Sequence, residues 1–166
     1  MRNIAPREGS ELEALGHAAA LHDIGKMAIP ESIIQKAGPL TTDEWKLVRQ
    51  HTVIGERIIA TSPALQRTAQ LVRWSHERVD GQGYPDGRSG DGIPLATRVL
   101  SVADAFDAMC SDRPYGRTRS REEALAELRR CAGTQFDGAV VAAFGRVLPG
   151  LASTAGAVKP KHPLPV

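Results

Sequence analysis

The chain has 166 residues, of which 42% are hydrophobic and 24% are charged, and its formal net charge is +2. This length and composition predict one globular domain with a buried core. The small charge argues against a broad nucleic-acid surface, and no apolar run approaches the roughly 18 residues of a membrane span. We therefore expect neither a nucleic-acid polymer nor a membrane as a partner. Cys110 and Cys131 form no C-x-x-C pattern, so they are predicted to be free thiols in a reducing compartment.

The first predicted helix begins near Leu12, and Gly25 and Pro30 are predicted to end it. The residues that recur on it at three- and four-residue steps are Leu12, Leu15, Ala19, His22, Asp23 and Lys26. Leu15 and Ala19 are expected to point inward, which places His22 and Asp23 near the core. An aspartate there needs a partner, because a buried and unpaired carboxylate is costly.

The second predicted helix begins at a capping box formed by Thr41 and Glu44 and runs to about Ala60. The residues expected on its inward face are Leu47, His51, Ile54 and Ile58. A third helix is predicted to begin at residues 62–63. It would carry Leu65, Leu71, Val72 and His76.

Residues 80–94 contain five glycines and two prolines, which predict a loop with several tight turns. Helical periodicity returns over residues 95–109, the most apolar segment, and Asp104 interrupts it. Two later helices are expected, one beginning at a Ser120–Glu123 capping box and one capped by Asp137.

These elements together predict an all-α fold, a compact multi-helix bundle that carries a Gly-rich loop. The domain is expected to span residues 1–149. Residues 150–166 are small, contain proline and have no periodicity, so we expect a disordered tail there.

Polar side chains on several of these helices are expected to point toward one centre. The set comprises His22, Asp23, His51, His76 and Asp104. Bound cations would explain all of them at once, because neutral imidazoles and ionised carboxylates are natural ligands of divalent metals. With Asp23 bridging two ions, ligand positions remain open for water and substrate oxygens, which is typical of a catalytic site. Such a site suits in-line attack on phosphorus.

Other residues are candidates for substrate contacts. Lys26 is placed to bind a scissile phosphate, although a lysine at a helix C-terminus is also favoured by the helix dipole. Gly83, Tyr84 and Pro85 form a loop whose backbone can approach a ligand and whose ring can stack on a base. The arginines crowded into one short segment could clamp an anion or form a solvated basic face: Arg113, Arg117, Arg119 and Arg121.

The residues resemble the HD-GYP domains, a branch of the HD superfamily of metal-dependent phosphohydrolases, over about residues 11–145. The segments that carry the resemblance are residues 22–26, 29–30, 36–41, 51–55, 76–78, 80–85, 93–94, 103–108, 111–115 and 133–137. The resemblance implies hydrolysis of cyclic di-GMP to linear pGpG or GMP with two or three iron or manganese ions, two sites being expected here. It also implies a bacterial cytoplasmic signalling output, fused to or associated with a receiver or sensor domain.

By the same resemblance, the residues that fall on metal ligands are His22, Asp23, His51, His76 and Asp104. Lys26, with Asp23, falls on the catalytic positions. Those that fall on substrate contacts are Gly83, Tyr84, Pro85 and Arg113.

The chain also departs from the family pattern. Ser75 stands where the family usually has a histidine, Gly116 stands at an often basic position, and upstream ligands are missing before His22. These departures predict an N-terminally truncated domain with an impaired site. They leave open a catalytically silent module that binds nucleotide or a partner such as a diguanylate cyclase. A phosphohydrolase acting on ordinary nucleotides is a third alternative.

Overall fold

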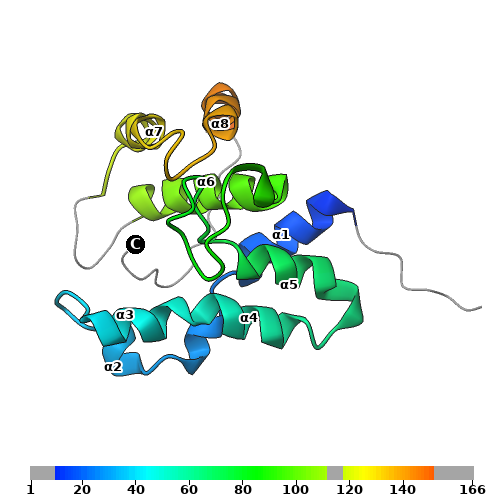
Figure 1. Cartoon of the computed structure of the whole chain (residues 1–166). Helices are drawn as coiled ribbons and strands as arrows, with labels where there is room; N and C mark the ends of the chain where they lie inside the picture. Colours follow the sequence, from blue (N-terminus) through cyan, green and yellow to red (C-terminus); the bar gives the residue numbers. More distant parts are fainter. Residues whose placement is uncertain (1–9, 112–117, 152–166) are drawn as a thin grey trace, which may run out of the picture.

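The computed structural model describes residues 10–111 and 118–151, and every regular element within them is helical (Figure 1). The elements are α1 (Glu11–Leu21), η1 (Ile24–Ala28), α2 (Glu31–Ile34), α3 (Thr42–Arg49), α4 (His51–Ile59), η2 (Pro63–Leu65), α5 (Gln66–Arg73), η3 (Gly90–Gly92), α6 (Leu95–Cys110), α7 (Arg121–Arg130) and α8 (Gly138–Leu151). The predicted all-α class is confirmed. Within the described ranges, no helix is long and apolar enough to cross a membrane.

The helices begin where the sequence supplies side-chain caps. Complete capping boxes open α3, at Thr41 and Glu44, and α7, at Ser120 and Glu123, as predicted. Asp137 Oδ1 accepts the amides of Ala139 and Val140 at 2.7 and 3.2 Å, so it caps α8. A further box at the start of α1 joins Ser10 and Glu13. This box was not predicted, although its S-x-x-E spacing is visible in the sequence.

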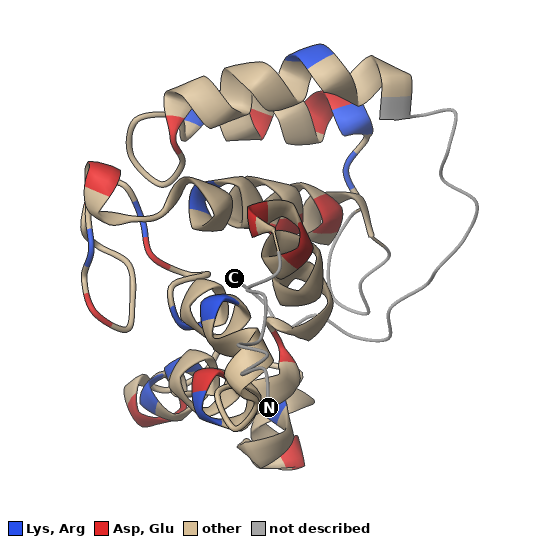
Figure 2. Cartoon of the chain, turned by 90° about the vertical axis from the view of Figure 1, so that its right-hand side faces the viewer, with Lys and Arg blue, Asp and Glu red and all other residues tan. Residues whose placement is uncertain are grey.

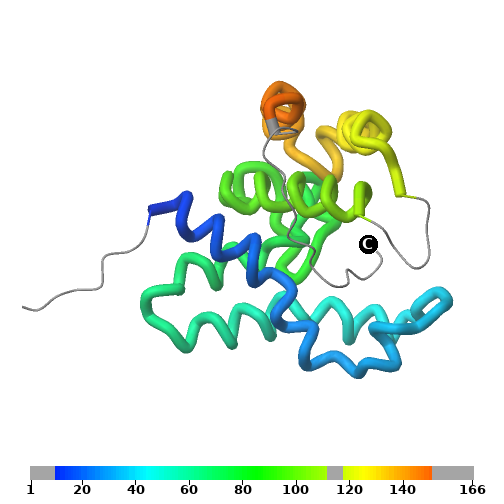
Figure 3. Tube along the Cα trace, turned by 180° about the vertical axis from the view of Figure 1, so that it is seen from behind, coloured from blue at the N-terminus to red at the C-terminus, as the bar shows by residue number. Residues whose placement is uncertain are grey.

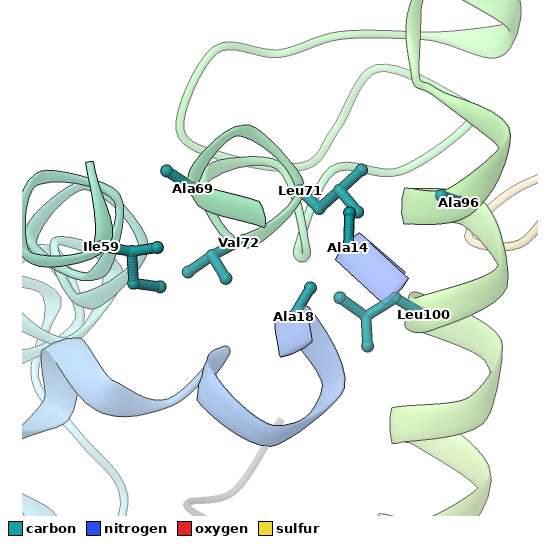
Figure 4. Close-up of a cluster of buried hydrophobic side chains, with 8 residues drawn as sticks. All are labelled: Ala14, Ala18, Ile59, Ala69, Leu71, Val72, Ala96 and Leu100. Atoms are coloured by element: carbon teal, nitrogen blue, oxygen red, sulfur yellow. The ribbon is translucent and has the colours of Figure 1, made fainter. Parts of the chain in front are cut away.

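Helix α6 is the central element, with helices packed on two sides of it. Figure 3 shows α1 running between α5 and α6, and α7 and α8 cover the opposite side of α6. One core lies between α1, α5 and α6 (Figure 4), where Ala14 and Ala18 pack against Val72 and Leu100. A second core gathers Val102 with residues of α7 and α8. Charged residues of both signs are spread over the helices (Figure 2).

The buried face of α1 differs from the predicted one. Ala14 and Ala18 are buried, whereas Ala19 is exposed and Leu12 is 76% exposed. The segment has apolar residues around most of the helix, so periodicity could not select the face. Small residues are buried because α1 packs closely between two neighbours.

The predicted helix from Thr41 to Ala60 is divided at Gln50 into α3 and α4. His51 points inward as expected and is 1% exposed. Leu47 and Ile58, however, are 40% and 41% exposed. The buried positions are Val48, His51, Thr52, Gly55 and Ile59. The inward face is therefore rotated by about one residue from the prediction, so that it includes the smaller residues at the α4–α5 contact.

Two further boundaries differ from prediction. Helix α1 ends at Leu21, so Asp23 and Lys26 follow it rather than lie on it. Helix α5 ends at Arg73, which leaves His76 in the turn that follows. At the other end of the chain, α8 includes residues 150 and 151 of the predicted tail, and residues 152–166 lie outside the described part.

The physical reason for the early end of α1 is the close approach of Gly25 to α4. A Cβ atom on Gly25 would overlap the carbonyl oxygen of His51 and lie 2.7 Å from the Gly55 nitrogen. The chain must leave the α1 helix to make this backbone contact. The contact also brings Asp23 alongside His51.

Candidate metal centre

The predicted donors converge from four segments of the fold. His22 and Asp23 follow α1, His51 opens α4, His76 follows α5, and Asp104 lies within α6. All five line one cavity of about 340 Å³, together with Lys26, Gly83 and Tyr84. The structure thus brings all five predicted donors to one cavity.

Backbone carbonyls orient two of the three imidazoles. His22 Nδ1 lies 2.9 Å from the Ala19 carbonyl oxygen, and His51 Nδ1 lies 2.7 Å from that of Val48. The hydrogen-bond network therefore assigns the proton to Nδ1 in both rings. In the neutral form of each ring, Nε2 then carries the lone pair and faces the cavity, which is the usual arrangement of a metal-binding histidine.

Three donor atoms form a tight group without hydrogen-bond partners. Asp23, His51 and His76 each offer one ligand atom within 4.8 Å of the others. Among the described residues, Asp23 Oδ1, His51 Nε2 and His76 Nε2 are buried and accept no hydrogen bond. Buried polar atoms are normally paired, so this group needs a partner of another kind. A divalent cation fits it, because the donors are an anionic oxygen and two neutral nitrogens.

The two carboxylate oxygens of Asp23 face different donors. Oδ1 lies 3.9 Å from His51 Nε2, and Oδ2 lies 3.6 Å from His22 Nε2. His22 Nε2 is also 3.3 Å from Asp104 Oδ1. Asp23 therefore stands between a His51–His76 group and a His22–Asp104 group, the position that a bridging carboxylate would occupy.

Lys26 belongs to the same cluster. Its Nζ lies 2.7 Å from Asp23 Oδ1, and its side chain is 18% exposed. The ammonium stands close to that oxygen without hydrogen-bonding geometry. It balances carboxylate charge and borders the cavity, where a phosphate oxygen could meet it.

Burial and charge give the imidazoles different protonation states. Burial lowers the pKa of His76 to about 4, and the charge of His51 adds to this effect. Burial also lowers the pKa of His51. At His22 burial is outweighed by the hydrogen bond to Asp104 and the charge of Asp23, and the pKa rises to about 9. Two neutral imidazoles therefore face the cavity at neutral pH, and the third is cationic without a metal.

The Gly-rich loop packs on His76 through its backbone and through Tyr84. A Cβ atom on Gly83 would overlap backbone atoms of residues 76–78, so the close contact requires glycine. The Tyr84 amide donates to the His76 carbonyl at 3.2 Å. The Tyr84 ring stacks on the His76 ring with centroids 5.2 Å apart and 18° between planes. Tyr84 is thus a wall of the cavity that also supports a candidate ligand.

Glu77, which was not predicted as a functional residue, anchors this loop. The residue is 3% exposed, and its Oε1 and Oε2 accept the amides of Asp86 and Arg88 at 2.6 and 2.9 Å. Its position directly before a Gly-rich segment was the available signal. A buried carboxylate that accepts two backbone hydrogen bonds fixes the loop relative to the metal donors.

A second anchor joins the loop to α5. Asp86 receives two hydrogen bonds from Arg73, both at 2.8 Å, and one from Trp74 Nε1 at 2.7 Å. The hydrogen bonds from Arg73 lower the pKa of Asp86 to about 2. Both anchors therefore hold the loop directly after the Gly83–Pro85 block.

Some predicted contacts are not brought to the cavity. Pro85 does not line it, and Arg113 and Arg117 lie outside the described residues. Arg121 instead donates to the Leu148 carbonyl, and Arg119 Nη1 lies 3.3 Å from Met109 Sδ. Neither Arg119 nor Arg121 lines the cavity, and the anion clamp stays a prediction.

Ser75 occupies the position at which a histidine was expected. It is 4% exposed, and its hydroxyl donates to the Val72 carbonyl at 2.9 Å. The hydroxyl thus completes a turn after α5. His17 is exposed on α1 and lines a different hollow of the surface.

Comparisons with known proteins agree with this geometry. A family described as the HD domain matches residues 5–140. The chain is 46% identical over 129 residues to a cyclic di-GMP phosphodiesterase of Thermotoga maritima, covering 76% of this chain and 35% of that protein. It is 37% identical over 134 residues to the 3'3'-cGAMP-specific phosphodiesterase 3 of Vibrio cholerae, and this alignment covers 81% of this chain and 29% of that protein. The chain spans about a third of the length of these relatives.

A solved structure shares the fold. The crystal structure of a cyclic GMP-AMP specific phosphodiesterase of Vibrio cholerae aligns with a TM-score of 0.62 at 22% identity. The alignment covers 87% of this chain and 39% of that one.

Proposed function

Because this chain belongs to the HD-domain family, in its HD-GYP branch, we propose that it is a metal-dependent phosphodiesterase that hydrolyses cyclic di-GMP to linear pGpG or GMP. The observation that carries the proposal is the group of unpartnered donors at Asp23, His51 and His76. Relatives named for cyclic di-GMP and for cGAMP support a cyclic dinucleotide as the substrate class. A fused or associated receiver or sensor domain is proposed as the source of the chain's input signal.

Two divalent ions, iron or manganese, are proposed for the cavity. His51 and His76 would hold one ion and His22 and Asp104 the other, with Asp23 shared between them. When bound, such ions activate water and stabilise the charge that develops on phosphate.

The residues of the chain supply binding and orientation. Lys26 Nζ is placed to donate to a phosphate oxygen, and its short distance to Asp23 keeps it at the reacting centre. Tyr84 borders the part of the cavity proposed for a nucleobase, and its ring supports His76 by stacking. Glu77 keeps this ring in place through the loop amides.

The experiment is hydrolysis of cyclic di-GMP by the purified chain with added Mn²⁺ or Fe²⁺, with products separated by chromatography. We expect turnover that Asp23→Ala abolishes and that a chelator stops. Glu122→Gln, on the exposed face of α7, serves as the matched control and should retain activity. No turnover with either metal, or turnover that survives Asp23→Ala, would contradict the proposal.

Ser75 supports a second candidate function, a catalytically silent module that binds nucleotide or a diguanylate cyclase. Its hydroxyl donates to the Val72 carbonyl, and a neutral serine oxygen is a weaker metal ligand than the imidazole expected at this position. Metal content distinguishes the candidates. Two ions per chain favour the enzyme, and one or none favours the binding module.

A further inference from the structure

Lysine and arginine side chains line the cavity at Lys26, Arg49 and Arg78. Arg49 differs from the other two because it has no carboxylate partner among the described residues. Lys26 lies beside Asp23, and Arg78 donates to Asp80 at 2.6 and 3.0 Å. Within residues 10–111 and 118–151, no carboxylate lies within 4.0 Å of the Arg49 guanidinium. An unpaired guanidinium on the wall of a cavity is available to an anionic ligand.

Aromatic rings hold this guanidinium in place. Its Cζ lies 5.2 Å from the ring centroid of Tyr84 and 5.9 Å from that of Trp45, one helical turn earlier on α3. Tyr84 is in turn stacked on His76. Arg49, the last residue of α3, is therefore linked to the His76 donor through the Tyr84 ring.

A cation–π contact does not use the N–H groups of a guanidinium as hydrogen-bond donors to oxygen, so they stay available to other acceptors. These donors match the oxygens of a phosphate in a two-pronged arrangement. Cation–π contact also limits the rotamers of the side chain, so less freedom is lost when an anion binds. Arg49 thus has both the chemistry and the orientation of a phosphate ligand.

We infer that Arg49 binds the second phosphate of a cyclic dinucleotide, the one that is not at the metal centre. This inference rests on the proposed function. A cyclic dinucleotide carries two phosphodiesters on opposite sides of its ring, and only one can meet Lys26 and the metal donors. The other must lie farther along the cavity wall, where Arg49 is the unpaired cation among the described lining residues. Arg49 would then select ligands with two phosphates over those with one.

The test compares Arg49→Gln with Arg57→Gln, which removes the same charge from an exposed arginine of α4 that does not line the cavity. Two substrates are used, cyclic di-GMP and bis(p-nitrophenyl) phosphate, which has a single phosphodiester. For Arg49→Gln we expect KM for cyclic di-GMP to rise about tenfold to a hundredfold, the usual effect of a lost charge-assisted hydrogen bond, while kcat changes less than about threefold. Hydrolysis of the single diester should fall less than about threefold by the same reasoning.

Three results would overturn the inference. One is an equal loss on both substrates, which would place Arg49 at the reacting centre. Another is an unchanged KM for cyclic di-GMP. The third is the same loss in Arg57→Gln, which would indicate a general charge effect.

Binding of cyclic di-GMP measured by calorimetry with chelator present separates this inference from the proposed function. If the wild-type chain fails to hydrolyse the dinucleotide but binds it, Arg49→Gln must still weaken binding about tenfold or more. Arg49→Lys retains the charge without the planar fork, and should recover part of the affinity. A wild-type chain that binds no cyclic di-GMP, or an Arg49→Gln variant that binds it equally well, refutes the role of Arg49.

Discussion

His51 Nε2 lies 3.9 Å from Asp23 Oδ1, and neither atom takes part in a hydrogen bond among the described residues. Both are buried polar atoms. Among the described residues the Asp23 oxygen has the Lys26 ammonium 2.7 Å away as its ion-pair partner, whereas the His51 nitrogen has none and destabilises the folded chain while it stays unpaired. This pair therefore links stability to ligand binding. The folded state gains a partner for both atoms when a cation enters.

We predict that divalent metal raises the melting temperature of the chain. Metal that binds only the folded state stabilises it by about 2.7 kcal/mol at a free concentration of one hundred times Kd. Thermal unfolding followed by circular dichroism, with Mn²⁺ or with chelator, measures the shift. Asp23→Ala should remove most of it, because the shared ligand is lost. A shift of equal size in Asp23→Ala would show that the metal binds elsewhere.

Metal binding is expected to release a proton from His22. Its pKa of about 9 means that the imidazole is protonated at pH 7 in the metal-free chain, whereas a ligand must be neutral. The proton therefore competes with the metal below pH 9, and affinity should rise with pH between 7 and 9 by up to about tenfold per unit. His51 and His76, whose pKa values are lowered, should release none at pH 7. Calorimetry in buffers of different ionisation enthalpy counts the protons. A release of zero at pH 7 would contradict this assignment.

Gly25→Ala is expected to destabilise the fold and damage the site together. The new Cβ would overlap the His51 carbonyl oxygen, which belongs to backbone and cannot move aside without displacing α4. We expect a loss of about 3 kcal/mol or more in the free energy of unfolding, in the range of a severe core clash, and loss of metal binding.

Gly16→Ala is the matched control for that change. No atom lies within 4 Å of a Cβ at Gly16, which is an exposed position of α1. Alanine there should stabilise the chain by about 0.5–1 kcal/mol through helix propensity. Urea denaturation of both variants gives the comparison, and equal destabilisation would refute the contact argument.

Glu77→Gln should loosen the Gly-rich loop. The carboxylate accepts two backbone amides, and an amide side chain can accept only one of them while its NH₂ group faces the other. We expect a loss of about 1–3 kcal/mol in the free energy of unfolding, the cost of an unsatisfied buried group. Activity should fall further than stability explains, because Tyr84 and His76 lose their support. Amide hydrogen exchange at residues 86 and 88 measures the loosening, and unchanged protection there would show that Glu77 does not hold the loop.

The sequence was sufficient to predict features that depend on local chemistry. The capping boxes at Thr41 and Ser120 could be read directly because a cap needs only residues three positions apart. The Gly-rich loop was equally plain from its composition. The donors His22, Asp23, His51, His76 and Asp104 could be selected because polar residues in apolar helical segments need a common explanation.

Features that depend on packing were not predictable in the same way. The inward face of α1 was assigned to its larger residues, yet Ala14 and Ala18 are buried because α1 runs closely between α5 and α6. Asp23 leaves the helix because Gly25 contacts the backbone of α4. Nothing local to either segment encodes these contacts, since each depends on a residue far away in the chain.

The amino-acid sequence by itself thus determined which side chains can bind metal and phosphate, because that follows from their chemical type and spacing. Only the tertiary structure decided how they are used. In the folded chain Asp23 lies between two groups of donors, and Glu77 accepts hydrogen bonds from amides of the Gly-rich loop. Arg49 contacts the Tyr84 ring and has no carboxylate partner among the described residues. The distances between these side chains, and the partners they bind, are set when the helices pack. Burial then holds each side chain against neighbours that are far away in the sequence.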